Sequence, residues 1–250
     1  MNSLALTKRY YADWLSVNPT LLEQQGGEYY LYSPERDTTQ EGYNQPFDLY
    51  GYLSDQLIII TYGKKLEPHI GWIQDFFHNS NNLTELKKLV KDKLGKHLQH
   101  NYKYYFTELP SDLDVSKAKQ LTTHDYPAYL RFFKTQYPDS EADTWLEDYF
   151  LNIATKGYVF GYYVGKKMVS ATDAPEMPYM RDSVIEIGIN TLPNYRGRGY
   201  AKIVIGAMIE FLMSIQKVPI VSVVSSNTAS QKLNECVGFV KLADVISLTL

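Results

Sequence analysis

The chain has 250 residues, 44% of them hydrophobic and 21% charged, and its 25 basic and 28 acidic side chains give a net charge of −3. These values are those of an ordinary globular protein. They exclude a disordered chain, a collagen and a mainly basic nucleic-acid-binding protein. The single cysteine, Cys236, excludes an intramolecular disulfide framework and a cysteine-rich zinc site, and it indicates a reducing compartment.

The first half of the chain predicts a mixture of helices and strands. Leucines that recur at helical spacing predict helices, and runs rich in Tyr and Ile predict strands. The helices are expected over residues 4–15 and 83–98, and the strands over 28–32, 57–62 and 102–109, with a polar loop over 33–47.

The second half is patterned more regularly. Helices are expected over residues 126–133, 145–154, 201–215 and 228–236, and strands over 158–164, 167–172, 183–190, 219–224 and 239–250. This order predicts an α/β (α+β) fold, in which helices cover a sheet. Pro110, Ser111 and Asp112 interrupt the pattern, which suggests an N-terminal mixed α/β region, residues 1–117, and a second domain, residues 118–250.

A glycine-rich turn joins the strand that ends at Asn190 to the next helix. It reads Arg196-Gly197-Arg198-Gly199-Tyr200-Ala201. Glycines let the backbone approach a ligand closely, and the unpaired N–H groups of a first helical turn attract anions. The turn therefore predicts a phosphate or pyrophosphate site, with extra charge from Arg196, Arg198 and Lys202.

Two common phosphate loops do not fit this turn. A Walker A loop needs Gly-Lys followed by Ser or Thr, and no Gly-Lys pair of the chain continues in that way. A dinucleotide fingerprint needs a third glycine three residues after Gly199, and that position is Lys202.

The turn resembles instead the phosphate loop of the GNAT acetyltransferases. Arg196, Gly199 and Ala201 match its pattern, and an Asn-capped helix that ends in Val237-Gly238-Phe239 follows one strand later. Within the family, the residues resemble the branch related to zwittermicin-resistance acetyltransferases; these are Ile185 to Ile187, Thr191, Tyr195 to Ala201, Pro219, and Asn227 to Ser230.

The resemblance covers about residues 119–250. It implies a C-terminal GNAT fold, with a central mixed twisted sheet flanked by helices. For residues 1–117 it rests on length and placement alone; a degenerate GNAT-like half is one interpretation of that region, and the residues do not show it.

The resemblance also implies acetyl-CoA as cosubstrate, a small amine as acceptor, and no metal. The pyrophosphate would bind the backbone of the glycine-rich turn, and the pantetheine would lie between two strands that splay apart, 187–191 and 219–225. The implied acetyl-CoA-binding residues are Ile189, Asn190, Thr191, Arg196, Gly197, Arg198, Gly199, Tyr200, Ala201, Asn227 and Ser230.

In this family a neutral amine attacks the thioester directly. Glu186 is the candidate general base, acting through water, and a backbone N–H near Thr191 would polarise the thioester carbonyl. Many members carry a tyrosine seven residues after the Asn that protonates the leaving thiolate; here that position is Asn234. Water, another tyrosine or Cys236 could replace it, or the thiolate could leave unassisted, although Cys236 is expected to be a small buried residue.

The acceptor amine is not identified by the sequence. Asp173, Glu176 and Asp182 precede the strand of Glu186 and could attract a cationic amine. An antibiotic or a metabolite is the expected acceptor, and the alternatives are a non-catalytic acyl-CoA-binding sensor and a protein or peptide acetyltransferase. A cytoplasmic protein with no nucleic-acid or membrane partner is expected, and a homodimer is left open.

Overall fold

The computed structural model describes residues 2–175 and 177–250, and both halves of the chain alternate between helices and strands. The α-helices are α1 (Ser3–Leu15), α2 (Ile70–Asn79), α3 (Leu83–Leu94), α4 (Tyr126–Gln136), α5 (Leu146–Thr155), α6 (Tyr200–Ser214) and α7 (Thr228–Glu235). The strands are β1 (Gly27–Tyr32), β2 (Leu49–Leu53), β3 (Leu57–Tyr62), β4 (Gln99–Phe106), β5 (Lys119–Gln120), β6 (Phe160–Val164), β7 (Lys167–Asp173), β8 (Val184–Glu186), β9 (Gly188–Thr191), β10 (Val218–Val224) and β11 (Phe239–Leu248).

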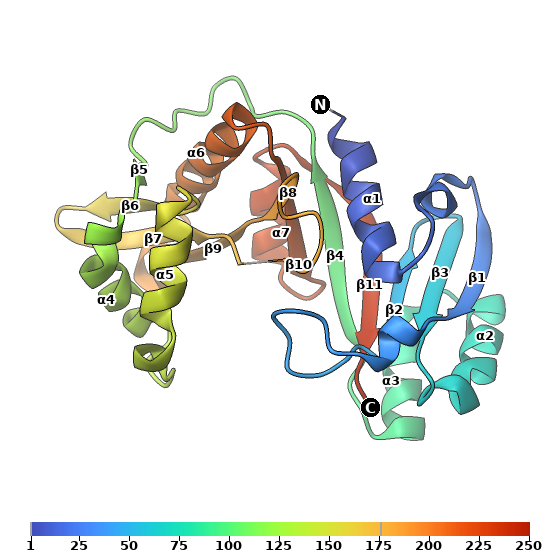
Figure 1. Ribbon diagram of the computed structural model, residues 1–250. Helices are drawn as coiled ribbons and strands as arrows, with labels where there is room; N and C mark the ends of the chain where they lie inside the picture. Colours follow the sequence, from blue (N-terminus) through green and yellow to red (C-terminus); the bar gives the residue numbers. More distant parts are fainter. Residues whose placement is uncertain (1, 176) are drawn as a thin grey trace.

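The strands form a larger mixed sheet and a smaller antiparallel sheet, which lie side by side (Figure 1). The larger sheet has the order β1-β3-β2-β11-β4-β10-β8, and the smaller has the order β5-β6-β7-β9. Two pairings in the larger sheet are parallel, β1 with β3 and β8 with β10, and the others are antiparallel.

The two sheets separate at Ile187. Before it, β8 pairs with β10 from Val184 to Glu186, and after it, β9 leaves β10 and pairs with β7. The backbone N–H of Ile187 makes the last hydrogen bond of this stretch to β10, to the carbonyl of Ile220 at 2.9 Å. β9 and β10 therefore splay apart, as the resemblance implied.

Helices cover both faces of the sheets. On the larger sheet, α1 packs on one face with Tyr10, Tyr11 and Leu15, and α2 and α3 pack on the opposite face, against β2, β3 and β11. On the smaller sheet, α4 and α5 lie on one face and α6 lies on the other (Figure 1). The most apolar helix, α6, fully buries Val204, Ile205, Met208, Ile209 and Leu212; each such side chain contributes about 1.5–3 kcal/mol.

The expected mixed sheet flanked by helices is confirmed, and most elements lie where the sequence predicts them. Two strands and one α-helix were missed, and one of these strands is the two-residue Lys119–Gln120. Leu49–Leu53 is a strand, and its five residues are all buried, so no alternation of polar and apolar positions marked it. Ile70–Asn79 is a helix. The helix predicted over 83–98 ends instead at Leu94, because Gly95 adopts a left-handed conformation (φ 67°) and terminates it.

Strand β4 joins the two halves of the chain. It lies between β10 and β11 and pairs antiparallel with both. One sheet thus contains strands from both sides of the predicted division at 117/118, and the proposal that residues 118–250 form a separate domain must account for this pairing. None of the helices in the described part of the chain has both the length and the apolar character needed to cross a bilayer.

Candidate functional site

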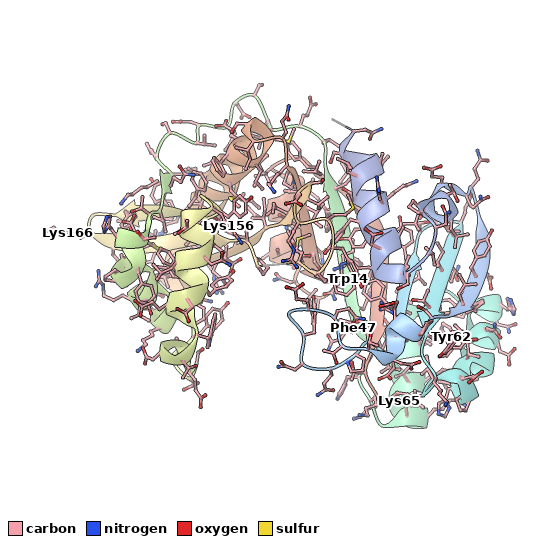
Figure 2. All side chains as sticks on the ribbon, viewed as in Figure 1. Trp14, Phe47, Tyr62, Lys65, Lys156 and Lys166 are labelled. Atoms are coloured by element: carbon pink, nitrogen blue, oxygen red, sulfur yellow. The ribbon has the colours of Figure 1, made fainter. Side chains whose placement is uncertain are left out.

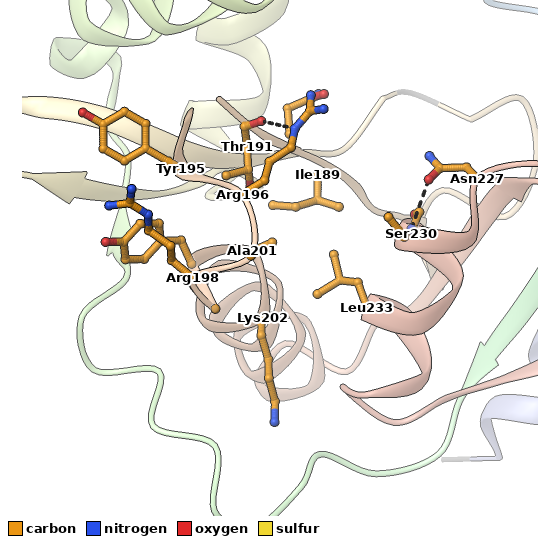
Figure 3. Close-up of a pocket in the computed structure, with 15 residues that line it drawn as sticks. Ile189, Thr191, Tyr195, Arg196, Arg198, Ala201, Lys202, Asn227, Ser230 and Leu233 are labelled. Atoms are coloured by element: carbon orange, nitrogen blue, oxygen red, sulfur yellow. Dashed lines mark hydrogen bonds between the residues drawn. The ribbon is translucent and has the colours of Figure 1, made fainter. Parts of the chain in front are cut away.

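A cavity of about 460 Å³ opens between β9, the glycine-rich turn and the start of α7 (Figure 3). Every residue that the sequence predicted for acetyl-CoA binding lines it. The cavity also contacts Lys202, which was expected to add charge to the phosphate site, and three residues that were not named for binding: Tyr195, Ala229 and Leu233. Ala229 and Leu233 could have been found from helical spacing, because they lie on the same side of α7 as Ser230.

The glycine-rich turn has the conformation that an anion site requires. Gly197 and Gly199 adopt positive φ angles of 73° and 81°, and a Cβ atom at either position would meet no other atom within 4 Å. Gly199 is the N-cap of α6, and no side chain caps this end. The N–H groups of the first turn of α6 are thus left to a ligand, with the positive end of the helix dipole behind them.

Two arginines of the turn are held by neighbouring groups. The Nε of Arg196 donates to the carbonyl of Thr191 at 3.0 Å, which folds this side chain back onto β9. The guanidinium of Arg198 lies 5.5 Å from the ring centre of Tyr195. Figure 3 shows Tyr195 and Arg198 on one side of the turn and Asn227, Ser230 and Leu233 on the other.

The α7 side of the cavity is organised by Asn227. Its side-chain oxygen accepts the backbone N–H of Ser230 at 3.1 Å and caps the helix. Asn234, at the position where many GNAT enzymes have a tyrosine, is 2% exposed, and its amide donates to the carbonyl of Ser230 at 2.9 Å. Cys236 is exposed, which corrects the expectation of a buried thiol. It is the C-cap residue of α7 and directly follows the last helical residue.

The hydroxyl of Thr191 has a partner within the smaller sheet. It shares a hydrogen bond of 2.8 Å with the hydroxyl of Ser170 on β7. This bond ties the side chain of Thr191 to β7 and leaves the backbone of this residue at the cavity wall.

Glu186 lies at the end of β8, outside the residues that line the cavity, and it is half-buried. Its backbone N–H donates to the sulfur of Met177 at 2.9 Å. Tyr10 and Tyr11 of α1 and Tyr50 of β2 lie near it: burial, and then the charge of Glu186, raise the pKa of each of these hydroxyls well above its usual value.

A second carboxylate lies on the neighbouring strand. Asp173, the last residue of β7, pairs with Gly188. Burial, and to a smaller extent the charge of Glu186, raise the pKa of Asp173 to about 6. Asp182, the other acidic residue described near this loop, is exposed, and Glu176 lies outside the described residues.

Tyr137 connects α4 to the strand that lines the cavity. Its hydroxyl donates to the side-chain oxygen of Asn190 at 2.8 Å. Burial, and then the charge of Asp173, raise the pKa of Tyr137. The sequence did not identify this contact, because Tyr137 and Asn190 are 53 positions apart.

Comparison with known proteins identifies one family. A family model described as GNAT acetyltransferase matches residues 72–244. A GNAT acetyltransferase structure from Colwellia psychrerythraea has a TM-score of 0.53 and 20% identity, covering 61% of this chain and 56% of that one. A GNAT-family structure from Novosphingobium aromaticivorans has a TM-score of 0.48 and 20% identity, covering 61% of this chain and 64% of that one. The match thus spans less than two thirds of either solved chain. No curated protein matches the sequence.

Proposed function

The chain belongs to the GNAT acetyltransferase family, and on this premise we propose that it transfers the acetyl group of acetyl-CoA to a primary amine of a small molecule, an antibiotic or a metabolite. The observation that carries the proposal is the cavity at the N-terminus of α6, where open space above Gly197 and Gly199 meets unpaired backbone N–H groups. The resemblance to the zwittermicin-resistance branch supports an acceptor of the antibiotic class.

The described residues suit the parts of acetyl-CoA. The pyrophosphate binds the N–H groups from Gly197 to Ala201, as anions do at helix N-termini, with Arg198 and Lys202 adding positive charge. The pantetheine follows β9 along the opening between β9 and β10, and the thioester then lies near Ile187, where the two sheets separate.

The chemistry is a direct transfer. Glu186 takes a proton from the acceptor ammonium through water, and the neutral nitrogen attacks the carbonyl carbon of the thioester. A backbone N–H near Thr191 polarises the carbonyl oxygen. The C–S bond then breaks and CoA leaves as a thiolate. Because a thiol has a pKa of about 8.5, the thiolate leaves without an acid from the protein, and Asn234 is compatible with this step.

Acetyl-CoA binding, measured by calorimetry, is the first test. Gly199→Glu should weaken binding at least tenfold, on the order of 1.4 kcal/mol or more, because it places a like charge in the phosphate site. Gly165→Glu is the matched control: Gly165 also has a positive φ, 59°, and open space around it, but it lies in the turn between β6 and β7. Equal binding by both variants, or no binding by the folded wild type, would overturn the proposal.

Transfer is tested by the release of the CoA thiol from acetyl-CoA with a panel of primary amines. The assay is run in a Cys236→Ser background, because the exposed thiol would react with the detecting reagent. Glu186→Gln should lower kcat strongly with little change in acetyl-CoA affinity. Binding of acetyl-CoA without transfer to any amine would favour the acyl-CoA sensor, and transfer to peptides alone would favour a protein acetyltransferase.

A further inference from the structure

The carboxylates of Asp173 and Glu186 lie on the same face of the strands that separate at Ile187. Ile185, Ile187 and Ile189 all pack with α6, so the alternating positions 186, 188 and 190 face the opposite side. Asp173 is directly opposite Gly188. A Cβ atom at position 188 would collide with the Asp173 carboxylate, so the glycine provides the space in which this carboxylate lies.

This face is bounded by tyrosines from both halves of the chain. Tyr10, Tyr11 and Tyr50 lie on the side of Glu186, together with Tyr43, whose pKa rises to about 12 through burial and the charge of Glu186. On the side of Asp173, burial and then the charge of Asp173 raise the pKa values of Tyr129, Tyr137 and Tyr149.

Two polar groups described on this face lack a partner: a tyrosine hydroxyl has no hydrogen bond, and a carboxylate has no cation beside it. The hydroxyl of Tyr11, none of whose surface is exposed, has no hydrogen-bond partner among the described residues. Among the described residues, no cation pairs with the Asp173 carboxylate; its own backbone N–H donates to it, and the nearby charge of Glu186 repels it. Lys103 is the cation near Glu186; it donates to Ser222 at 2.7 Å, and burial lowers its pKa. Buried polar groups usually have partners, so this face has the character of a binding site.

The charge balance of the reaction indicates the ligand. The attacking amine must become neutral, so its proton passes to Glu186 and its own charge is lost. Above about pH 6 the second carboxylate is ionised, and an acceptor neutralises it with a cation that keeps its proton. Resting on the proposed function, we infer that the acceptor is a diamine: its reactive amino group lies at Glu186, and a second, protonated amino group pairs with Asp173.

The strand geometry sets the distance between the two nitrogens. Cα atoms two residues apart in extended backbone are about 7 Å apart, which gives the scale of the separation between position 186 and position 188, beside which the Asp173 carboxylate lies. A chain of three to six carbons between the nitrogens spans such a distance. The reactive ammonium loses one proton to Glu186, and its next N–H proton ends on the departing thiolate as the amide forms.

The test compares α,ω-diaminoalkanes of three to six carbons with n-alkylamines of equal length at pH 8. Binding is measured by calorimetry, with and without CoA, and kcat/KM is measured with acetyl-CoA. At least one diamine should bind and react at least tenfold better than its alkylamine. Asp173→Asn should abolish this preference by raising KM much more for the diamine than for the alkylamine. Asp182→Asn, which removes an exposed charge from the same loop, should retain the preference.

Each outcome decides the inference. It is overturned if diamines and alkylamines bind and react equally, if no diamine binds to the CoA-loaded protein, or if Asp173→Asn retains the preference. A failure of CoA binding instead contradicts the proposed function, and diamine binding to the protein without CoA then still decides whether the acidic site exists. A folded Asp173→Asn variant with unchanged CoA affinity excludes a general loss of structure.

Discussion

The ionised carboxylate of Asp173 destabilises the folded protein because burial disfavours its charge. The native protein holds the proton of this carboxyl more tightly than the unfolded chain does, since its pKa is about 6 in the fold and about 3.9 in a free chain. Between these values the folded state binds more protons, so the free energy of unfolding falls as the pH rises from about 4 to about 6. Above this window the ionised carboxylate opposes folding, and below it the cost disappears.

Asp173→Asn should therefore stabilise the protein at pH 8 and have little effect near pH 4. About two pKa units correspond to at most roughly 3 kcal/mol, and part of this is lost to relaxation and solvent. Urea denaturation at the two pH values measures the difference. Asp182→Asn, at an exposed carboxylate of the same loop, should show no such pH-dependent gain. An equal effect of Asp173→Asn at both pH values would contradict the expectation.

The tyrosines show how residues with no sequence pattern become a site. The chain contains 22 of them, spread over its length. Tyr10, Tyr50 and Tyr149 come from α1, β2 and α5, and the charges of Glu186 and Asp173 act on them. Their common location depends on packing between elements far apart in the chain, so spacing along the sequence contained no signal for it.

At the scale of elements, the opening at Ile187 decides where the cavity lies. The sequence predicted one continuous strand over 183–190, whereas the structure divides it between two sheets. The apolar pattern continues across the division, because Ile185, Ile187 and Ile189 all face α6. Periodicity reports which side of a strand is buried, and it does not report the strand with which each residue pairs.

The two asparagine N-caps of α3 and α7 offer a matched pair. Asn82 accepts the N–H groups of Thr84 and Glu85, and Asn227 accepts that of Ser230. Replacing either by Ala should cost about 1 kcal/mol of stability through the lost cap. Only Asn227→Ala should also weaken acetyl-CoA binding, by several-fold, because Asn227 lines the cavity. Thermal unfolding and calorimetry measure the two effects, and equal affinity in both variants would show that Asn227 is a cap alone.

On the scale of the whole molecule, the N-terminal region is part of the same structure as the glycine-rich turn. The loop before β8 packs against this region as well: Arg181 pairs with Glu41 at 2.5 Å, and the ring centre of Tyr179 lies 5.3 Å from that of Trp14. Figure 2 shows Phe47 near Trp14 of α1, and their ring centres are 5.8 Å apart. The loop that leads to Glu186 therefore rests on residues from the first fifth of the chain.

A fragment of residues 118–250 should not fold on its own. Without β4, strands β10 and β11 lose the partner that lies between them, and the α1-covered face with Val184, Val218 and Ile220 becomes exposed. Hydrogen exchange and denaturant unfolding should show no cooperative core in the fragment, and co-expression with residues 1–117 should restore one. A cooperatively folded fragment that binds acetyl-CoA would contradict this and support the division at 117/118.

The sequence by itself determined the fold class, most of the helices and strands, and most of the residues that surround the cavity, because these features depend on local sequence. The glycine-rich turn, the start of α6 and the Asn cap of α7 are each defined within a few consecutive residues, where glycine conformation and capping chemistry act. The family resemblance depends on the same short segments, so it identifies the same glycine-rich turn.

Only the tertiary structure decided the rest. The insertion of β4 between β10 and β11, the pairing of Asp173 with Gly188 and the bond from Tyr137 to Asn190 all join residues distant in sequence. The elevated pKa of Asp173 also arises from burial by other elements. Such contacts depend on which faces pack together and which strands pair, and a strand's own residues specify its buried side without naming its neighbour.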